Sequence, residues 1–122
     1  VIDEIHAQGG LCVLAHPYRR YSCPETLVEC FDLVEGFNAR SPKDENNRAF
    51  AFAQTFKKPM TAGSDAHLSF EIGRGRIYVD SDVKKSLQKG TTNIEGNISN
   101  YYAVHGLSLT IETFKNHLGM DL

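Results

Sequence analysis

Three short apolar runs place the strongest constraint on how this 122-residue chain can fold. They occupy residues 11–15, 33–37 and 60–63, and segments with helical spacing of apolar side chains lie between them. Apolar runs of this length are typical of strands that are covered on both faces, as in parallel sheets. Because strands that alternate with helices indicate βαβ units, the sequence predicts an α/β fold with mostly parallel strands.

Two more strands are predicted in the second half of the chain, at residues 75–79 and 92–96. Helices are predicted at residues 1–8, 24–31, 45–56, 80–90 and 97–118. The helix at 45–56 has the clearest pattern, because its apolar residues recur at helical spacing and Pro59 follows it.

The composition excludes some classes of function. A formal net charge of −2 provides no general attraction to nucleic acid or to anionic lipid. No run approaches the roughly 18 consecutive apolar residues of a membrane-spanning helix. Cys12, Cys23 and Cys30 are odd in number and lack C-x-x-C spacing, which favours reduced thiols over a disulfide or a cysteine metal site. We therefore expect a cytoplasmic protein.

Candidate metal ligands follow two of the predicted strands. His16 comes directly after the first strand, and Asp65 and His67 come after the third. In an extended segment, side chains two residues apart point the same way, so Asp65 and His67 could share one cation or serve two adjacent ones. Because loops at the carboxyl ends of parallel strands collect at one rim, His16 is expected to meet this pair.

Imidazole and carboxylate groups are suitable ligands for Zn, Mn or Fe in sites that carry out hydrolysis. A divalent cation can lower the pKa of bound water from about 15.7 to about 7, which makes hydroxide available at neutral pH. Three ligands are too few for a cluster of two or three metals. His6, His105 and His117 lie in predicted helices away from the rim and are not expected to complete it.

Other polar residues near the rim could contact a substrate or support a ligand. Guanidinium groups form bidentate contacts with phosphate, so the candidate phosphate or substrate contacts are Arg19, Arg20, Arg40 and Arg74. Solvated loop arginines are the alternative interpretation. Glu35 and Asn38 lie on or just after the second strand and could orient a metal ligand, although a structural role is equally compatible with their position.

Three segments together resemble a known family. Residues 9–17 contain Ala-His-Pro, residues 33–40 contain Glu-Gly-Phe-Asn-Ala-Arg, and residues 63–67 read Gly-Ser-Asp-Ala-His. In this order and spacing they resemble the second half of the polymerase-and-histidinol-phosphatase (PHP) domain, over most of residues 1–96. The resemblance implies the C-terminal portion of a distorted (β/α)7, TIM-like barrel, with two or three Zn, Mn or Fe ions and phosphoesterase activity. It also implies that His16, Asp65 and His67 are metal ligands.

The chain departs from the family pattern at its start. The family's opening His-x-His strand and several further ligands are absent, and we expect them upstream of Val1. Residues 1–122 would then be a partial PHP-like domain, with a C-terminal helical extension at residues 97–122. Metal occupancy and activity of the isolated fragment are expected to be low. Exposed strand edges would pair with the missing N-terminal half of the domain, or cause self-association.

The resulting hypothesis is a C-terminal fragment of a PHP-like metal-dependent phosphoesterase. In the intact protein, metal-activated hydroxide would hydrolyse a small phosphate ester or a nucleotide. Two alternatives stay open, a noncatalytic interaction or scaffold module with vestigial rim residues and a related metal-dependent amidohydrolase. Whether this chain is itself an enzyme is also open.

Overall fold

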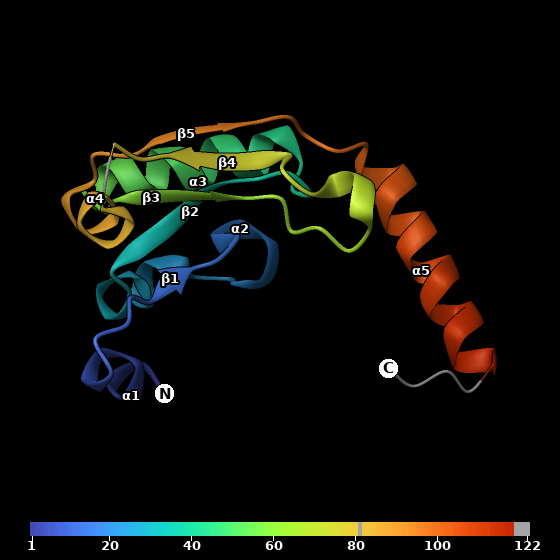
Figure 1. Cartoon of the computed structure of the whole chain (residues 1–122), viewed down its shortest axis with the longest axis horizontal. Coiled ribbons are helices and arrows are strands. Elements are labelled where there is room, and N and C mark those ends of the chain that lie inside the picture. Colours follow the sequence, from blue (N-terminus) through green and yellow to red (C-terminus); the bar gives the residue numbers. More distant parts are fainter. Residues whose placement is uncertain (81, 119–122) are drawn as a thin grey trace.

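The computed structural model describes residues 1–80 and 82–118. Figure 1 shows the helices and strands, coloured along the chain. In chain order they are α1 (Ile2–Ala7), β1 (Val13–Leu14), α2 (Pro17–Arg20), two 3-10 turns (Pro24–Thr26 and Val28–Cys30), β2 (Leu33–Asn38), α3 (Lys43–Thr55), β3 (Met60–Gly63), a third 3-10 turn (Ser69–Glu71), β4 (Gly75–Tyr78), α4 (Val83–Lys89), β5 (Asn93–Gly96) and α5 (Tyr101–Leu118).

The three apolar runs form a parallel sheet, as the sequence predicts, and the strands lie in the order β1-β2-β3. Val13 lies opposite Leu33, and Val34 lies opposite Met60. The first strand is shorter than expected, because only two residues of the run 11–15 form ladder pairs. Over the described part of the chain these strands form an open sheet and do not close into a barrel.

The last two strands run antiparallel to each other, which differs from the mostly parallel arrangement predicted. Gly75 lies opposite Gly96, and Tyr78 lies opposite Asn93. For β5 to run parallel to β4, the connection would have to return the chain to the start of β4 before β5 begins. The short helix α4 leaves the chain near the end of β4, so β5 runs in the opposite direction. The pattern of apolar residues gives no information on this direction.

Helix α3 supplies the core that covers the parallel sheet. Phe52 and Ala53 of this helix form one buried cluster with Leu14 of β1 and Val34 of β2. Burying an apolar side chain of this size stabilises the fold by roughly 1.5–3 kcal/mol. The apolar residues predicted at helical spacing in residues 45–56 therefore form the face of α3 that packs against the sheet.

Two glycines allow the β4–β5 pair to lie against the parallel sheet. A Cβ atom at Gly75 would lie 2.3 Å from the backbone oxygen of Gly63, and one at Gly96 would lie 2.0 Å from the ring of Phe37. Both distances are shorter than side chains tolerate, so only glycine permits this close approach. The close approach holds the β4–β5 pair beside the end of β3.

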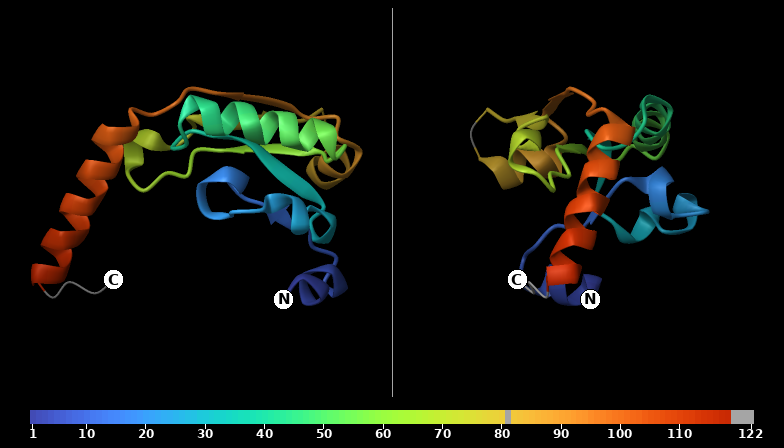
Figure 2. Two further views of the ribbon diagram at one scale, coloured as in Figure 1. Left: turned by 180° about the vertical axis from the view of Figure 1, so that it is seen from behind. Right: turned by 90° about the vertical axis from the view of Figure 1, so that its right-hand side faces the viewer.

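Helix α5 projects from one end of the layered body, as two further views show (Figure 2). The predicted helix at 97–118 begins at Tyr101, after a segment in which the Ser99 N–H donates to the Ala39 carbonyl at 2.7 Å. Leu109 and Phe114 on this helix are 63% and 64% exposed. In the described ranges, no helix combines the length and apolar character needed to cross a membrane.

Candidate functional site

His16, the first predicted ligand, follows β1 and precedes α2. Its φ of 30° lies in the left-handed region that residues other than glycine rarely adopt, and its N–H donates to Glu35 Oε2 at 2.8 Å. The ring Nδ1 atom is buried and has no hydrogen-bond partner in the part of the chain that the structure describes. Backbone strain and an orphaned polar atom both cost free energy, and such features are typical of functional positions.

Glu35 on β2 connects the ends of the three parallel strands. Its carboxylate accepts from the His16 N–H and, at 3.1 Å, from Asn38 Nδ2. A Cβ atom at Gly63 would lie 2.5 Å from Glu35 Oε1, so the glycine leaves room for this carboxylate. Glu35 and Asn38 line the same narrow cavity as His16, and their role toward a ligand stays a prediction.

The loop after β3 brings the other two predicted ligands together. His67 Nδ1 lies 2.8 Å from the Asp65 carbonyl oxygen and 3.8 Å from Asp65 Oδ1. Asp65 has a φ of 49°, which turns the chain sharply at this point. The His67 side chain is 52% exposed, so its imidazole is open to solvent.

Arg19 joins the loop of His16 to the loop of Asp65. Its Nη1 atom lies 2.5 Å from Asp65 Oδ2, although the two residues are 46 positions apart. Burial raises the pKa of Asp65, but the hydrogen bond and charge of Arg19 outweigh burial and lower this pKa below its ordinary value, with smaller contributions from Asn38 and His67. Asp65 is therefore ionised at neutral pH, as a metal ligand must be.

The three predicted ligands do not form a closed cage. Within residues 1–80 and 82–118, the group of His, Cys, Asp and Glu side chains whose ligand atoms all lie within 4.8 Å of one another is a different one, treated below. The rim residues fit divalent cations by their chemistry, since they offer two imidazoles and an ionised carboxylate. Their arrangement is open, and one oxygen of Asp65 already binds Arg19.

A carboxylate oxygen that was not predicted adds to this region. Glu45 Oε2, like His16 Nδ1, is buried and has no hydrogen-bond partner among the described residues, and both residues line the cavity behind the rim. This cavity is too small to hold a water molecule, so a buried water does not satisfy the two atoms. The sequence signal for Glu45 was weak, because an acidic residue in the first turn of a helix is explained by the helix dipole alone.

The arginines predicted to contact phosphate have different surroundings. Arg40 is 2% exposed, and its Nε and Nη2 atoms donate to the two carboxylate oxygens of Glu71 at 2.7 and 2.8 Å. The guanidinium of Arg40 is buried and bonded to Glu71, so Arg40 does not present it to a phosphate group as predicted. Arg19 lies at the rim, Arg20 is exposed at the end of α2, and Arg74 is half-buried between the third 3-10 turn and β4.

Glu71 is a second residue that sequence reasoning missed. Its side chain is fully buried, and its Oε2 atom accepts the backbone N–H groups of His67 at 3.1 Å and Leu68 at 3.0 Å. It therefore connects the His67 loop to the buried guanidinium of Arg40. A glutamate three residues after the start of a helical turn can bind back to that start, and this spacing was the available signal.

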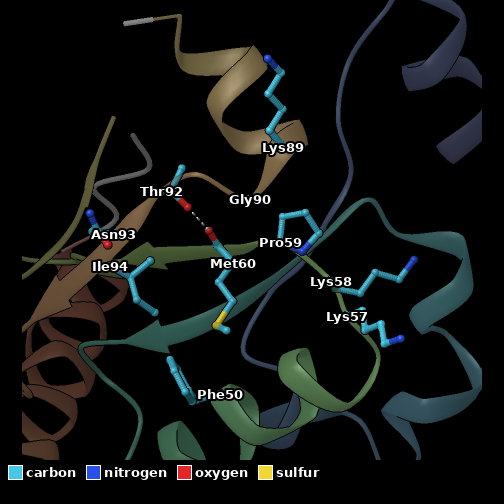
Figure 3. A pocket seen from close by; sticks show the side chains of 10 residues that line it. All are labelled: Phe50, Lys57, Lys58, Pro59, Met60, Lys89, Gly90, Thr92, Asn93 and Ile94. Carbon is cyan, nitrogen blue, oxygen red and sulfur yellow. Dashed lines mark hydrogen bonds between the residues drawn. The ribbon is translucent and has the colours of Figure 1, made fainter. Parts of the chain in front are cut away.

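A separate pocket of about 480 Å³ lies at the opposite end of β3, where the strand begins. Figure 3 shows Met60 and Ile94 inside it, with the Thr92 hydroxyl donating to the Met60 carbonyl at 3.1 Å. Lysines border the pocket, and Lys58 donates to the carbonyl of Phe31 at 2.9 Å. The residues that line it include no predicted ligand, so its volume is not evidence for the rim site.

Comparison with known proteins supports the family resemblance. Residues 43–92, from α3 to the residue before β5, match the family described as PHP-associated, which is consistent with the C-terminal part of a PHP domain. An uncharacterized protein of Methanocaldococcus jannaschii, MJ0417, is 32% identical over 87 residues. The aligned region covers 62% of this chain and 37% of that protein, so the chain spans little more than a third of its relative.

Proposed function

We propose that this chain, whose residues 43–92 match the PHP-associated family, is the C-terminal portion of a PHP-like domain in a metal-dependent phosphoesterase. Residues 1–122 would form part of a distorted (β/α)7 barrel, completed by strands outside this chain, with residues 97–122 as a helical extension. The parallel sheet covered by α3 supports this proposal, because parallel strands alternating with helices are the repeating unit of such barrels.

The observation that carries the proposal is the ion pair between Arg19 and Asp65. It holds the loop that follows β1 against the loop that follows β3, at the carboxyl end of the parallel strands. Ligand sites in α/β folds are built from these loops. The His16 ring nitrogen without a partner and the exposed His67 imidazole lie on the same two loops.

In this proposal His16, Asp65 and His67 hold divalent cations, Zn, Mn or Fe, together with ligands from outside this chain. Bound cations supply positive charge at the phosphate oxygens and lower the pKa of a nearby water molecule. Asp65 contributes a carboxylate that is already ionised. Arg19, and Arg20 beside it, present guanidinium groups that bind phosphate oxygens of a small phosphate ester or nucleotide.

Assays of the intact protein test this function. With Zn, Mn or Fe present, we expect hydrolysis of phosphate monoesters or nucleotides, and a loss of more than about 100-fold in His16→Ala and Asp65→Ala together with loss of bound metal. His117→Ala, on the exposed surface of α5, is the matched control and should retain activity. Unchanged metal content in both rim variants would rule the function out, and hydrolysis of amides alone would favour the amidohydrolase.

A noncatalytic interaction module is the second candidate, and one observation favours it. Arg19 neutralises Asp65 directly, and the rim donors are not gathered around a common point. An ion pair of this kind can hold two loops together without any ligand. Intact wild-type protein that binds no metal at the rim, and whose stability depends on both Arg19 and Asp65, would support this candidate.

A further inference from the structure

A second group of metal-ligating side chains lies at the opposite end of the parallel strands from the rim. His6 Nε2 lies 2.8 Å from Asp32 Oδ2, and the ligand atoms of His6, Cys12 and Asp32 all lie within 4.8 Å of one another. Cys12 directly precedes β1 and Asp32 directly precedes β2, and these strands pair in parallel from their first residues. The group is therefore distinct from the loops that follow the strands.

Backbone contacts preorganise two of these residues. The Cys12 N–H donates to Asp32 Oδ2 at 2.7 Å, and the Asp32 N–H donates to the Cys12 carbonyl at 3.0 Å. The Cys12 N–H is the main cause that lowers the pKa of Asp32, with contributions from His6 and Lys58 that act against burial.

The three side chains differ in their exposure to solvent. Cys12 is 5% exposed, whereas the side chains of Asp32 and His6 are 33% and 42% exposed. A cation could thus enter from the solvent side, between the histidine and the carboxylate, and reach the sulfur behind them. The buried sulfur would also be shielded from competing ligands in solution.

His6, the third residue of the group, lies on helix α1, and the packing of α1 does not explain the position of this helix. Helix α1 buries none of its residues, and Gly9, with a φ of 73°, turns the chain away from its end. Lys84 of α4 donates to the Gly9 carbonyl, and His6 binds Asp32. Figure 1 shows α1 below the start of β1, joined to it by a short connecting segment. A ligand shared by His6, Cys12 and Asp32 would fix this helix to the sheet.

We propose that His6, Cys12 and Asp32 bind one Zn²⁺ ion, with water in the fourth position. Thiolate, imidazole and carboxylate are the ligands that Zn²⁺ takes in tetrahedral sites, at about 2.0–2.3 Å. The thiolate selects Zn²⁺ over the hard cations Mg²⁺ and Ca²⁺. The His6–Asp32 contact opens by less than about 1 Å when the ion enters between the two side chains. This site is independent of the proposed phosphoesterase function.

Cobalt substitution tests the site, because Co²⁺ bound to a thiolate has a charge-transfer absorption band in the near ultraviolet that oxygen and nitrogen ligands do not produce. We expect this band in the wild-type chain titrated with Co²⁺, and its loss on addition of Zn²⁺. Cys12→Ser should abolish the band, and His6→Gln should weaken Co²⁺ affinity by more than about 100-fold. His6→Gln is the safer variant for folding, since α1 contributes no buried residue.

Two controls separate this site from other cysteines and from the rim. Cys23→Ser combined with Cys30→Ser removes the exposed thiols and should leave the band unchanged. His16→Gln combined with Asp65→Asn should also leave it unchanged, even where metal bound at the rim is lost. A band that is absent in the wild type, or that persists in a folded Cys12→Ser protein, overturns the proposal. Circular dichroism of each variant establishes that it is folded.

Discussion

The buried ion pair between Arg40 and Glu71 is the residue-level feature on which the second half of the chain most depends. Besides its two bonds to Glu71, Arg40 Nη2 donates to Ser108 Oγ on α5 at 2.6 Å. Arg40→Met leaves the Glu71 carboxylate buried without its partner. We expect a loss of about 3–5 kcal/mol in the free energy of unfolding, measured by urea denaturation.

Two variants make this prediction specific. Arg20→Met removes an exposed guanidinium and should change stability by no more than about 0.5 kcal/mol. Arg40→Met combined with Glu71→Leu removes both buried charges and should recover part of the loss, since apolar replacement of a buried pair is often neutral but the N–H groups of His67 and Leu68 lose their acceptor. A single Arg40→Met variant as stable as wild type would contradict the assignment of this pair as structural.

The pKa of Glu71 predicts how stability depends on pH. The hydrogen bond from Arg40 is the largest cause of its lowered pKa; burial acts in the opposite direction, and the N–H groups of His67 and Leu68 and the charge of Arg40 add smaller contributions that lower this pKa. Because the folded-state pKa lies below the unfolded value, the contribution is present above about pH 4 and is lost as the pH falls through the folded-state pKa. Asp32 and Asp65 act in the same direction.

Thermal unfolding between pH 3 and pH 7 checks this dependence. We expect the melting temperature of the wild type to fall steeply below about pH 4. Glu71→Gln should melt at a lower temperature at pH 7 but lose less on acidification, because the titrating group is gone. Glu112→Gln, on exposed α5, should follow the wild type. A Glu71→Gln curve parallel to that of the wild type would show that Glu71 does not carry the effect.

At the scale of the elements, the position of the β4–β5 pair depends on backbone contact through glycine. Gly75→Ala would place a methyl group 2.3 Å from the Gly63 carbonyl oxygen, which is backbone and cannot rotate away. We expect destabilisation by about 1–3 kcal/mol in urea denaturation.

Gly106→Ala is the matched control on another element. Apart from the nearby backbone of α5 itself, no atom of residues 1–80 and 82–118 lies within 4 Å of a Cβ atom at this position, so the methyl group meets no obstacle. Alanine in a helix interior should stabilise the chain by roughly 0.5–1 kcal/mol. Opposite signs for the two substitutions are expected, and a neutral Gly75→Ala would mean that the β4–β5 pair is free to move away from β3.

At the scale of the whole molecule, the open sheet predicts self-association. β1 is an edge strand, and Val13 on it is 37% exposed. Light scattering coupled to size exclusion should show a mass that rises with protein concentration, and Val13→Lys should reduce this rise, because a charge on an edge strand opposes pairing. Leu109→Lys on α5 is the comparison variant. Should only Leu109→Lys reduce the mass, the helix surface is the contact and the edge is not.

Much of the architecture could be predicted because it follows from short-range pattern. Each predicted element follows from residues that are close together in the sequence: the run of apolar residues before His16, the helical spacing of Phe52 and Phe56, and the proline after α3. The pattern also predicted that these strands run parallel to one another. The direction of β5 could not be predicted, because the same residues are compatible with either a parallel or an antiparallel pairing with β4.

The residue types at the rim, two histidines and an aspartate that follow short strands, are a property of the chain itself, since their order along it dictates which loops they occupy. The contacts that side chains make with residues of other segments are not determined by this order. The burial of Arg40 against Glu71, the contact of Arg19 with Asp65, and the contacts of Asp32 with His6 and with Cys12 join positions 20 to 46 residues apart. Such contacts arise only when strands align in register, because no local spacing encodes a distance between separate loops.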